Sequence, residues 1–216
     1  MTDIALYWFR DDLRLTDLAG LAAAAAHDHV VPVYIRDTTL GGEWSPGGAS
    51  DWWLHGSLEA LQQDLQRQGI NLVLRSGDTQ SVLSALAQEI GANAVYCSRH
   101  YQPWSAALEH GIRDALAQSN VTLKRYPGTL LHEPEDVATG SGTPFKVFTP
   151  FWRACLRRPD PAPTLPAPTL RGADRPIASE ALADWQLLPT APNWAAGWDA
   201  LWQPGEAGAH DALAQF

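Results

Sequence analysis

Cysteine is scarce in this sequence of 216 residues, which contains only Cys97 and Cys155. The two lie in unrelated contexts, without a CxxC pair, so we expect no disulfide framework. The histidines supply no third ligand at metal-binding spacing, even where His27 and His29 flank Asp28. The sequence therefore predicts no metal site, and it suits a reducing, cytoplasmic compartment.

Long hydrophobic runs and positive charge are also lacking. The run from Ala19 to Ala26 is far shorter than the roughly 20 residues that a membrane-spanning helix needs. The N-terminus has no basic segment of the kind that opens a signal peptide. Lys and Arg number 15 against 24 Asp and Glu, a formal net charge of −9. We therefore expect no membrane insertion, and no tight binding of nucleic acid by this chain alone, because phosphates are neutralised by clustered basic residues.

The common nucleotide-binding and hydrolase motifs are absent too. The turn after the first apolar run reads Arg10-Asp11-Asp12, where a dinucleotide-binding fold would carry GxGxxG. The Gly-rich segment 41–48 lacks the Lys-Ser/Thr end of a phosphate-binding loop, and a flexible connection is the simpler interpretation. No GxSxG nucleophile turn occurs. The sequence therefore provides no candidate catalytic residue.

The first 125 residues alternate between short apolar runs and segments of helical periodicity. The apolar runs predict strands, and the periodic segments between them predict helices. The strands are expected at residues 4–9, 30–35, 72–74, 94–97 and from 121 onward, and the helices at 18–26, from 50 or 51 to 68, 81–90 and 105–118. This alternation predicts an α/β fold with a five-stranded parallel, Rossmann-like sheet and helices on both faces.

The sequence changes character after Arg125. Residues 126–150 resemble a loop, and a short helix is predicted at 151–158, where Arg153, Arg157 and Arg158 form either a solvated face or a contact with phosphate or another domain. An extended Pro-rich connector follows. The C-terminal tail has apolar anchors without a core of its own, so we expect it to lie on another surface.

Several segments resemble the DNA photolyase/cryptochrome family. Residues 7–17 (Tyr-Trp-Phe-Arg-Asp-Asp-Leu-Arg-Leu-Thr-Asp) are similar to the opening signature of that family, and residues 141–152 are similar to the segment that leaves its α/β domain. Shorter similarities occur in the same order as in the family: Trp52-Trp53-Leu54-His55, Gly77-Asp78, Tyr101-Gln102-Pro103 and Trp202-Gln203-Pro204-Gly205-Glu206.

The resemblance implies an N-terminal α/β domain with a light-harvesting antenna chromophore, followed by a helical domain that holds FAD and the damaged DNA. Photolyases use light to repair cyclobutane pyrimidine dimers. The chain stops at Phe216, where the helical domain of the family begins, so we expect FAD, DNA and repair to belong to a missing C-terminal domain. The expected divisions are an α/β domain (1–133), its exit segment (134–158), a Pro/Trp-rich interdomain linker (159–200) and the start of the helical domain (201–216).

A chromophore in this fold would bind beyond the carboxyl ends of the strands, where the strand order reverses. Trp104 and Trp52 offer surfaces on which a planar ligand stacks. The candidate cofactor-binding residues are Phe9, Arg10, Asp37, Asp51, Trp52, His100, Trp104 and Ser105. Asp51 stands where the family usually has Arg, and Ser105 where folate-binding members have a carboxylate. A folate, a deazaflavin, a flavin and a different planar ligand all remain open.

Two other interpretations are retained. One is a nucleotide- or flavin-binding α/β module that pairs with another polypeptide, as in electron-transfer flavoproteins, because a fold does not determine a function. The other is the N-terminal domain of a cryptochrome photoreceptor. Without the missing C-terminal domain, the tail tryptophans Trp185, Trp194, Trp198 and Trp202 are expected to expose an apolar patch, through which the chain self-associates.

Overall fold

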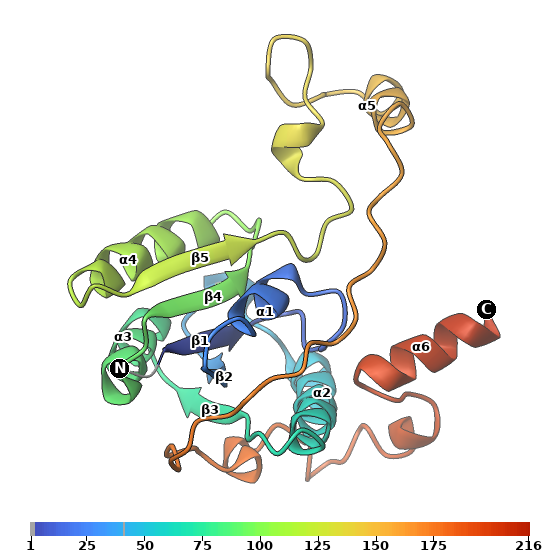
Figure 1. Ribbon diagram of the computed structural model, residues 1–216. Coiled ribbons are helices and arrows are strands. Elements are labelled where there is room, and N and C mark those ends of the chain that lie inside the picture. The colour runs from blue at the N-terminus through green and yellow to red at the C-terminus, as the bar shows by residue number, and fades with distance from the viewer. Residues whose placement is uncertain (1–2, 41) are drawn as a thin grey trace.

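A five-stranded parallel sheet forms the centre of the protein in the computed structural model, which describes residues 3–40 and 42–216 (Figure 1). The strand order is β3-β2-β1-β4-β5, and every neighbouring pair is parallel. The strands are β1 (Ile4–Phe9), β2 (His29–Arg36), β3 (Val73–Ser76), β4 (Ala94–Ser98) and β5 (Thr122–Tyr126). The predicted α/β fold is confirmed, and the strand order reverses between β1 and β4.

Helices cover both faces of the sheet (Figure 1). The helices α1 (Ala19–Ala24) and α2 (Gly48–Gln66) share a buried cluster with Ala5, Tyr7 and Phe9 of β1. The helices α3 (Thr79–Ile90) and α4 (Ser105–Ala117) share the opposite cluster with Leu6 and Trp8. Successive strand residues point to opposite faces, so β1 is apolar throughout because both of its faces are covered.

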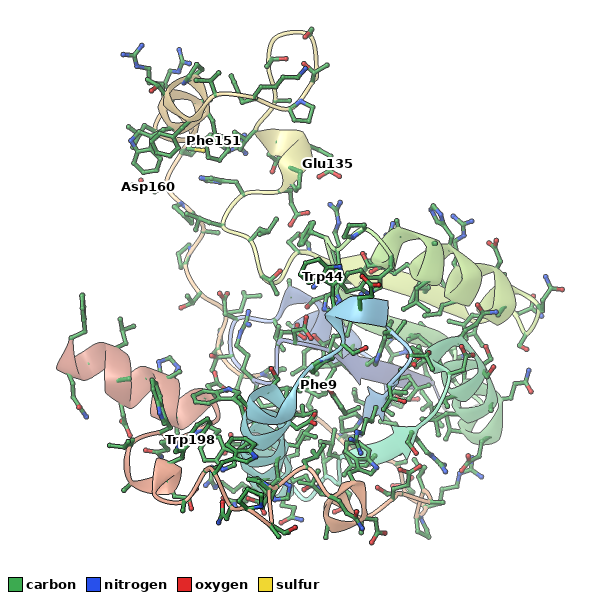
Figure 2. The ribbon with its side chains drawn as sticks, turned by 180° about the vertical axis from the view of Figure 1, so that it is seen from behind. Phe9, Trp44, Glu135, Phe151, Asp160 and Trp198 are labelled. Atoms are coloured by element: carbon green, nitrogen blue, oxygen red, sulfur yellow. The ribbon has the colours of Figure 1, made fainter. Side chains whose placement is uncertain are left out.

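Residues 127–160 form an arm that extends away from the sheet, as Figures 1 and 2 show. The arm contains η2 (Pro134–Asp136) and α5 (Phe148–Cys155). Its base is held by Arg99, whose guanidinium lies 2.5 Å from Glu133 and 2.7 Å from Glu135. The helix expected at 151–158 is α5, which begins three residues earlier, at Phe148. Pro150 is compatible with that start because it lies in the first turn, where the backbone N–H has no intrahelical acceptor.

The Pro-rich connector runs back across the α/β domain and completes its core. Val30 donates its N–H to the Arg171 carbonyl at 2.8 Å, and Glu180 donates its N–H to the Leu74 carbonyl at 2.9 Å. Four connector side chains join the cluster beneath α1 and α2: Leu170, Leu182, Trp185 and Leu187. The same segment contains the short helix η3 (Leu182–Trp185). The connector is therefore part of the folded domain.

The expectation that Trp185 belongs to an exposed patch is wrong. Its side chain is only 6% exposed, and its ring lies 6.0 Å from that of Tyr34. Its indole N–H donates to Glu180 at 2.6 Å, so the polar end of the buried ring is satisfied. The anchors of an extended segment follow no helical or strand period, so their burial is not visible in the sequence pattern.

The tail contains η4 (Trp198–Ala200) and α6 (Glu206–Gln215). The Glu206 carboxylate accepts hydrogen bonds from the N–H groups of Leu15 at 2.8 Å and Thr16 at 3.1 Å, and from the Thr16 hydroxyl. Gly205 precedes it with φ +102°, and a Cβ at Gly205 would lie 2.5 Å from that of Ala60. These contacts hold the start of α6 against α2 and the β1–α1 loop.

We predict that Trp185→Ala lowers the free energy of unfolding by about 3–5 kcal/mol, because it opens a cavity in the core and removes the indole donor from Oε2 of Glu180. Urea denaturation measures the loss. The matched control Trp194→Ala removes a ring that is 45% exposed and should cost at most about 1 kcal/mol. Equal losses in the two variants would contradict the proposed contribution of the connector to the core.

We also predict that acid releases α6. Burial alone would raise the pKa of Glu206, but hydrogen bonds from Leu15 and Thr16 outweigh burial and hold this pKa below its usual range. The Glu206 carboxylate therefore fully stabilises the docking of α6 at any pH above about 4.3, the pKa of a Glu side chain in the unfolded chain. This stabilisation is lost as the pH falls through the lower pKa that Glu206 has in the folded chain. Pepsin, which works in acid, should cleave residues 201–216 faster as the pH falls through this window.

The Glu206→Gln variant is the control for this acid effect, because its side chain keeps an acceptor oxygen but does not titrate. Cleavage of the tail in this variant, corrected for the activity of pepsin on an unfolded substrate, should show little dependence on pH. A wild-type tail that pepsin cleaves at the same corrected rate across the window would disprove the acid release.

Candidate functional site

A pocket of about 400 Å³ opens at the carboxyl ends of β1, β2 and β4, where the strand order reverses. Phe9 ends β1, Arg36 ends β2 and is followed by Asp37, and His100 lies two residues beyond β4. All four line the pocket. Its volume lies within the range of small-molecule sites, roughly 300–1,000 Å³. The topology thus places the pocket where doubly wound sheets bind ligands.

Six of the eight residues that the sequence suggested line this pocket together: Phe9, Arg10, Asp37, Asp51, His100 and Trp104. Trp52 does not, because it follows Asp51 by one residue on α2 and so points to a different side. It packs against Trp198 at 5.2 Å. Ser105 does not line the pocket either, because its side chain is 1% exposed. Its hydroxyl donates to the backbone carbonyls of His100 and Gln102, at 3.0 and 2.7 Å. Ser105 thus shapes the turn before α4.

The pocket also includes aromatic residues that sequence reasoning did not single out. Trp8 and Tyr34 line it, together with Trp44, which lies in η1 (Gly42–Trp44). Trp44 is 82% exposed, and Figure 2 shows it on the same side of the molecule as Phe9. The sequence predicts a flexible connection over 41–48; the structure has η1 within it, and Gly41 lies outside the described residues. The feature of the sequence that could have pointed to Trp44 is a lone Trp in a Gly/Pro-rich loop beyond the second strand.

Arg10 is held by a buried carboxylate beneath the pocket. Its Nη1 lies 2.6 Å from Glu109 and donates to the Ser98 carbonyl at 3.1 Å, while Arg125 reaches the other Glu109 oxygen at 2.6 Å. Glu109 is 2% exposed. Burial alone would raise the Glu109 pKa, but hydrogen bonds from both arginines hold it below its usual range. The guanidinium of Arg10 also lies 4.4 Å from the centre of the Trp8 ring. Arg10 is therefore a structural cation.

Asp37 is fully engaged by backbone and hydroxyl groups. One oxygen accepts from the N–H and hydroxyl of Thr39, at 3.0 and 2.6 Å, and the other from the N–H and hydroxyl of Thr79, both at 2.9 Å. These bonds outweigh burial, which alone would raise the pKa, and hold the Asp37 pKa below its usual range. Asp37 thus fixes the loop after β2 to the start of α3.

His100 supplies a neutral polar group to the pocket. Burial lowers its pKa, and the positive charge of Arg10 lowers it further, although the nearby carboxylates of Asp11, Asp12 and Glu109 oppose the shift. Its Nε2 lies 3.2 Å from the Asp11 carboxylate. An uncharged imidazole both donates and accepts hydrogen bonds. With carboxylates at Asp11 and Asp51 and exposed rings at Trp44 and Trp104, the pocket suits a planar, uncharged heteroaromatic ring that carries N–H donors.

Other kinds of site find less support. Within residues 3–40 and 42–216, no group of three or more His, Cys, Asp or Glu side chains is arranged to hold a metal ion. The same described residues contain no helix with the length and apolar character needed to cross a bilayer.

Fold and pocket together define a doubly wound α/β domain with a pocket at the point where the strand order reverses. The model of the DNA photolyase family matches residues 5–169, and the chain belongs to that family. A deoxyribodipyrimidine photo-lyase of Agrobacterium fabrum is 43% identical over 98% of this chain, and cryptochrome-1 of Arabidopsis thaliana is 32% identical over 98%. Members of the family bind FAD and antenna chromophores.

The chain corresponds to the N-terminal α/β part of its relatives. It superposes on the crystal structure of a class III photolyase from Agrobacterium tumefaciens with a TM-score of 0.92 and 42% identity, covering 99% of this chain. It spans 44% of the length of that structure, 44% of the Agrobacterium fabrum enzyme and 31% of the Arabidopsis cryptochrome. The resemblance inferred from residues 7–17 and 141–152 is confirmed.

We predict that Glu109→Gln destabilises the domain by about 3–5 kcal/mol, because it leaves the buried charge of Arg10 without a counter-charge. Chemical denaturation at neutral pH gives the value. The control Glu89→Gln breaks the exposed Glu89–Arg75 pair (3.1 Å) and should cost at most about 1 kcal/mol. If Glu109→Gln is as mild as this control, the buried pair does not hold the floor of the pocket.

Proposed function

We propose that this domain holds an antenna chromophore in the pocket at the carboxyl ends of β1, β2 and β4. The observation that carries the proposal is that six of the eight residues suggested for one cofactor site line one pocket at the reversal of strand order. Membership in a family that binds antenna chromophores supports it. The chromophore would absorb light and pass the excitation to an FAD outside this chain.

The proposed ligand is the planar ring system of a folate, a deazaflavin or a flavin. Trp104 is 37% exposed and Trp44 82% exposed, so both have ring surface free for stacking. The carboxylates of Asp11 and Asp51 would pair with polar edges of the ring. Arg10 is already paired with Glu109, and Arg36 donates to the Trp185 carbonyl at 2.7 Å, so we propose that any phosphate or glutamate group of the ligand faces solvent.

For the whole protein we propose light-driven repair of cyclobutane pyrimidine dimers, in the cytoplasm. FAD and damaged DNA would bind to a helical C-terminal domain that partners this one, and the chain alone would not repair DNA. The similarity to a deoxyribodipyrimidine photo-lyase supports repair, and the free thiols of Cys97 and Cys155 suit a reducing compartment. A cryptochrome photoreceptor is the second candidate, favoured by the match to cryptochrome-1. The third candidate is a module like those of electron-transfer flavoproteins. It is less favoured, because such a module gives no reason for residues 141–152 to resemble the photolyase family.

We also propose that the chain self-associates through its tail. Five apolar side chains between residues 194 and 216 are at least 45% exposed: Trp194, Leu201, Trp202, Leu213 and Phe216. Trp198 is partly covered by Trp52, with the ring centres 5.2 Å apart. The exposed set therefore differs from the one expected, since it excludes Trp185, which is buried, and Trp198, which is partly covered.

The chromophore proposal is tested by titrating the purified chain with riboflavin, a deazaflavin or a methenyl-folate and recording near-ultraviolet and blue absorption. A bound chromophore should show a shifted band, and Trp104→Ala should weaken binding about three- to tenfold through lost stacking. The control is Trp152→Ala, which removes an exposed ring from α5, a helix that lies away from the sheet (Figure 1). Absence of binding for all three ligands, or equal losses in both variants, would count against the proposal.

A further inference from the structure

The loop between β4 and α4, residues 99–104, forms one wall of the pocket. Three of its side chains line the pocket: His100, Gln102 and Trp104. They occupy every second position, an alternation typical of extended backbone, in which successive side chains point to opposite sides. The position of this loop therefore decides where an imidazole, an amide and an indole ring of the pocket lie.

The alternate side chains of the same loop hold the arm. The guanidinium of Arg99 lies 2.5 Å from the Glu133 carboxylate and 2.7 Å from that of Glu135. The Tyr101 hydroxyl donates to the other Glu133 oxygen at 2.5 Å. The guanidinium of Arg99 also lies 5.5 Å from the centre of the Tyr101 ring. These four side chains form one cluster, which we call the clamp.

The clamp is the polar attachment of the outer arm to the α/β domain. Among the residues that the structure describes, every hydrogen bond or ion pair between 130–160 and the α/β domain ends on Arg99 or Tyr101. Neither of the two buried clusters in the described chain contains a residue of 127–160. The arm thus depends on the clamp for its position, whereas the core of the domain does not depend on the arm.

We propose that Glu133 and Glu135 of the arm act as positioning residues for the pocket. They hold Arg99 and Tyr101, and thereby fix the loop that presents Trp104 to a ligand. Neither carboxylate lines the pocket, so both act through the loop. The inference rests on the antenna function proposed above, and it adds a part of the chain, the arm, that acts on the site from outside.

The proposed coupling has a consequence for the arm itself. Coupling between two sites is reciprocal: if the clamped arm tightens ligand binding by some factor, the bound ligand tightens the clamp by the same factor. The arm leaves the sheet after β5 and contains α5 (Figure 1). A domain or partner that binds the arm would therefore also change the affinity of the pocket for its ligand.

The first test needs no ligand. The chain is labelled with fluorotryptophan, and the fluorine NMR resonance of Trp104 is assigned as the one that disappears in Trp104→Phe. E133Q/E135Q, the clamp variant, removes both carboxylate charges and keeps the size of the side chains. We expect the Trp104 resonance to shift or broaden in this variant, while those of the buried Trp52 and Trp185 stay unchanged because the core is intact. An unchanged Trp104 resonance would overturn the proposal.

The matched control for the clamp variant is E59Q/E89Q. It removes two carboxylates from α2 and α3 that belong neither to the clamp nor to the pocket lining. The total change in charge is the same, so a general electrostatic effect would appear in both variants. We expect the Trp104 resonance of this control to stay at its wild-type position.

A double-mutant cycle shows whether the arm acts through Arg99. R99Q breaks the clamp from the side of the loop and should move the Trp104 resonance as the clamp variant does. R99Q added to the clamp variant should move it no further, because side chains that act through one contact are not additive. A combined variant whose shift is the sum of the two separate shifts would show independent effects and would also overturn the proposal.

The second test measures binding with riboflavin, a deazaflavin and a methenyl-folate as probes. The clamp variant should bind whichever probe the wild type binds about fivefold or more weakly, a factor typical of coupling between sites. E59Q/E89Q should bind this probe as the wild type does. Urea denaturation should give the same midpoint for all three proteins, since the arm contributes nothing to the buried core.

The reverse effect is measured at the arm. A fluorescent maleimide is attached to Cys155, the partly exposed thiol of α5, while Cys97 is 0% exposed and stays unlabelled in the folded chain. Saturation with the bound probe should raise the anisotropy of the label in the wild type and leave it unchanged in the clamp variant. A label that responds equally in both would contradict the coupling.

The antenna proposal and this inference fail separately. If no probe binds the wild type but the Trp104 resonance responds to the clamp variant and not to its control, the antenna function is rejected and the positioning of the loop by the arm stands. If one probe binds equally well to the wild type and to the clamp variant, the antenna function stands and this inference is rejected.

Discussion

The structure depends on the burial of β1 on both faces. Tyr7 and Phe9 contact the cluster under α1 and α2, while Leu6 and Trp8 contact the cluster under α3 and α4. Burial of apolar surface is the dominant favourable contribution to folding. A strand covered on both sides ends abruptly where the chain becomes charged, at Arg10. The buried Glu109 then compensates this charge at 2.6 Å, and the same ion pair forms the floor beneath the pocket.

The polar groups around the pocket divide into supports and free groups. Arg10 and Asp37 are occupied by Glu109 and by Thr39 and Thr79, so they fix the backbone at the ends of β1 and β2. Asp11 and Asp51 remain available to a ligand, together with exposed aromatic rings, while the Nε2 of His100 lies 3.2 Å from Asp11. A rigid floor of satisfied charges beneath a few free polar groups is a common arrangement in ligand sites, where a small number of placed groups gives specificity.

Outside the sheet, the connector and the arm behave differently although both look irregular in sequence. The connector is hydrogen bonded to Val30 and Leu74 and buries Leu170 and Trp185, so it belongs to the core. The arm is held at its base by Arg99 and leaves Phe148 and Trp152 exposed. An amphipathic helix with a solvated apolar face is typical of an interaction surface.

The sequence by itself determined the α/β class, the five parallel strands and the family, because strand burial and helix periodicity are local properties of residues such as those of 4–9 and 81–90. Its motifs also selected Phe9, His100 and Trp104 for the pocket. Only the tertiary structure decided that Trp52 and Ser105 turn away from it, that Trp44 lies beside it and that Trp185 is buried. These outcomes depend on which side of a helix faces a neighbour and on contacts between segments distant in sequence, such as Trp185 with Tyr34. A linear pattern carries no information on such contacts.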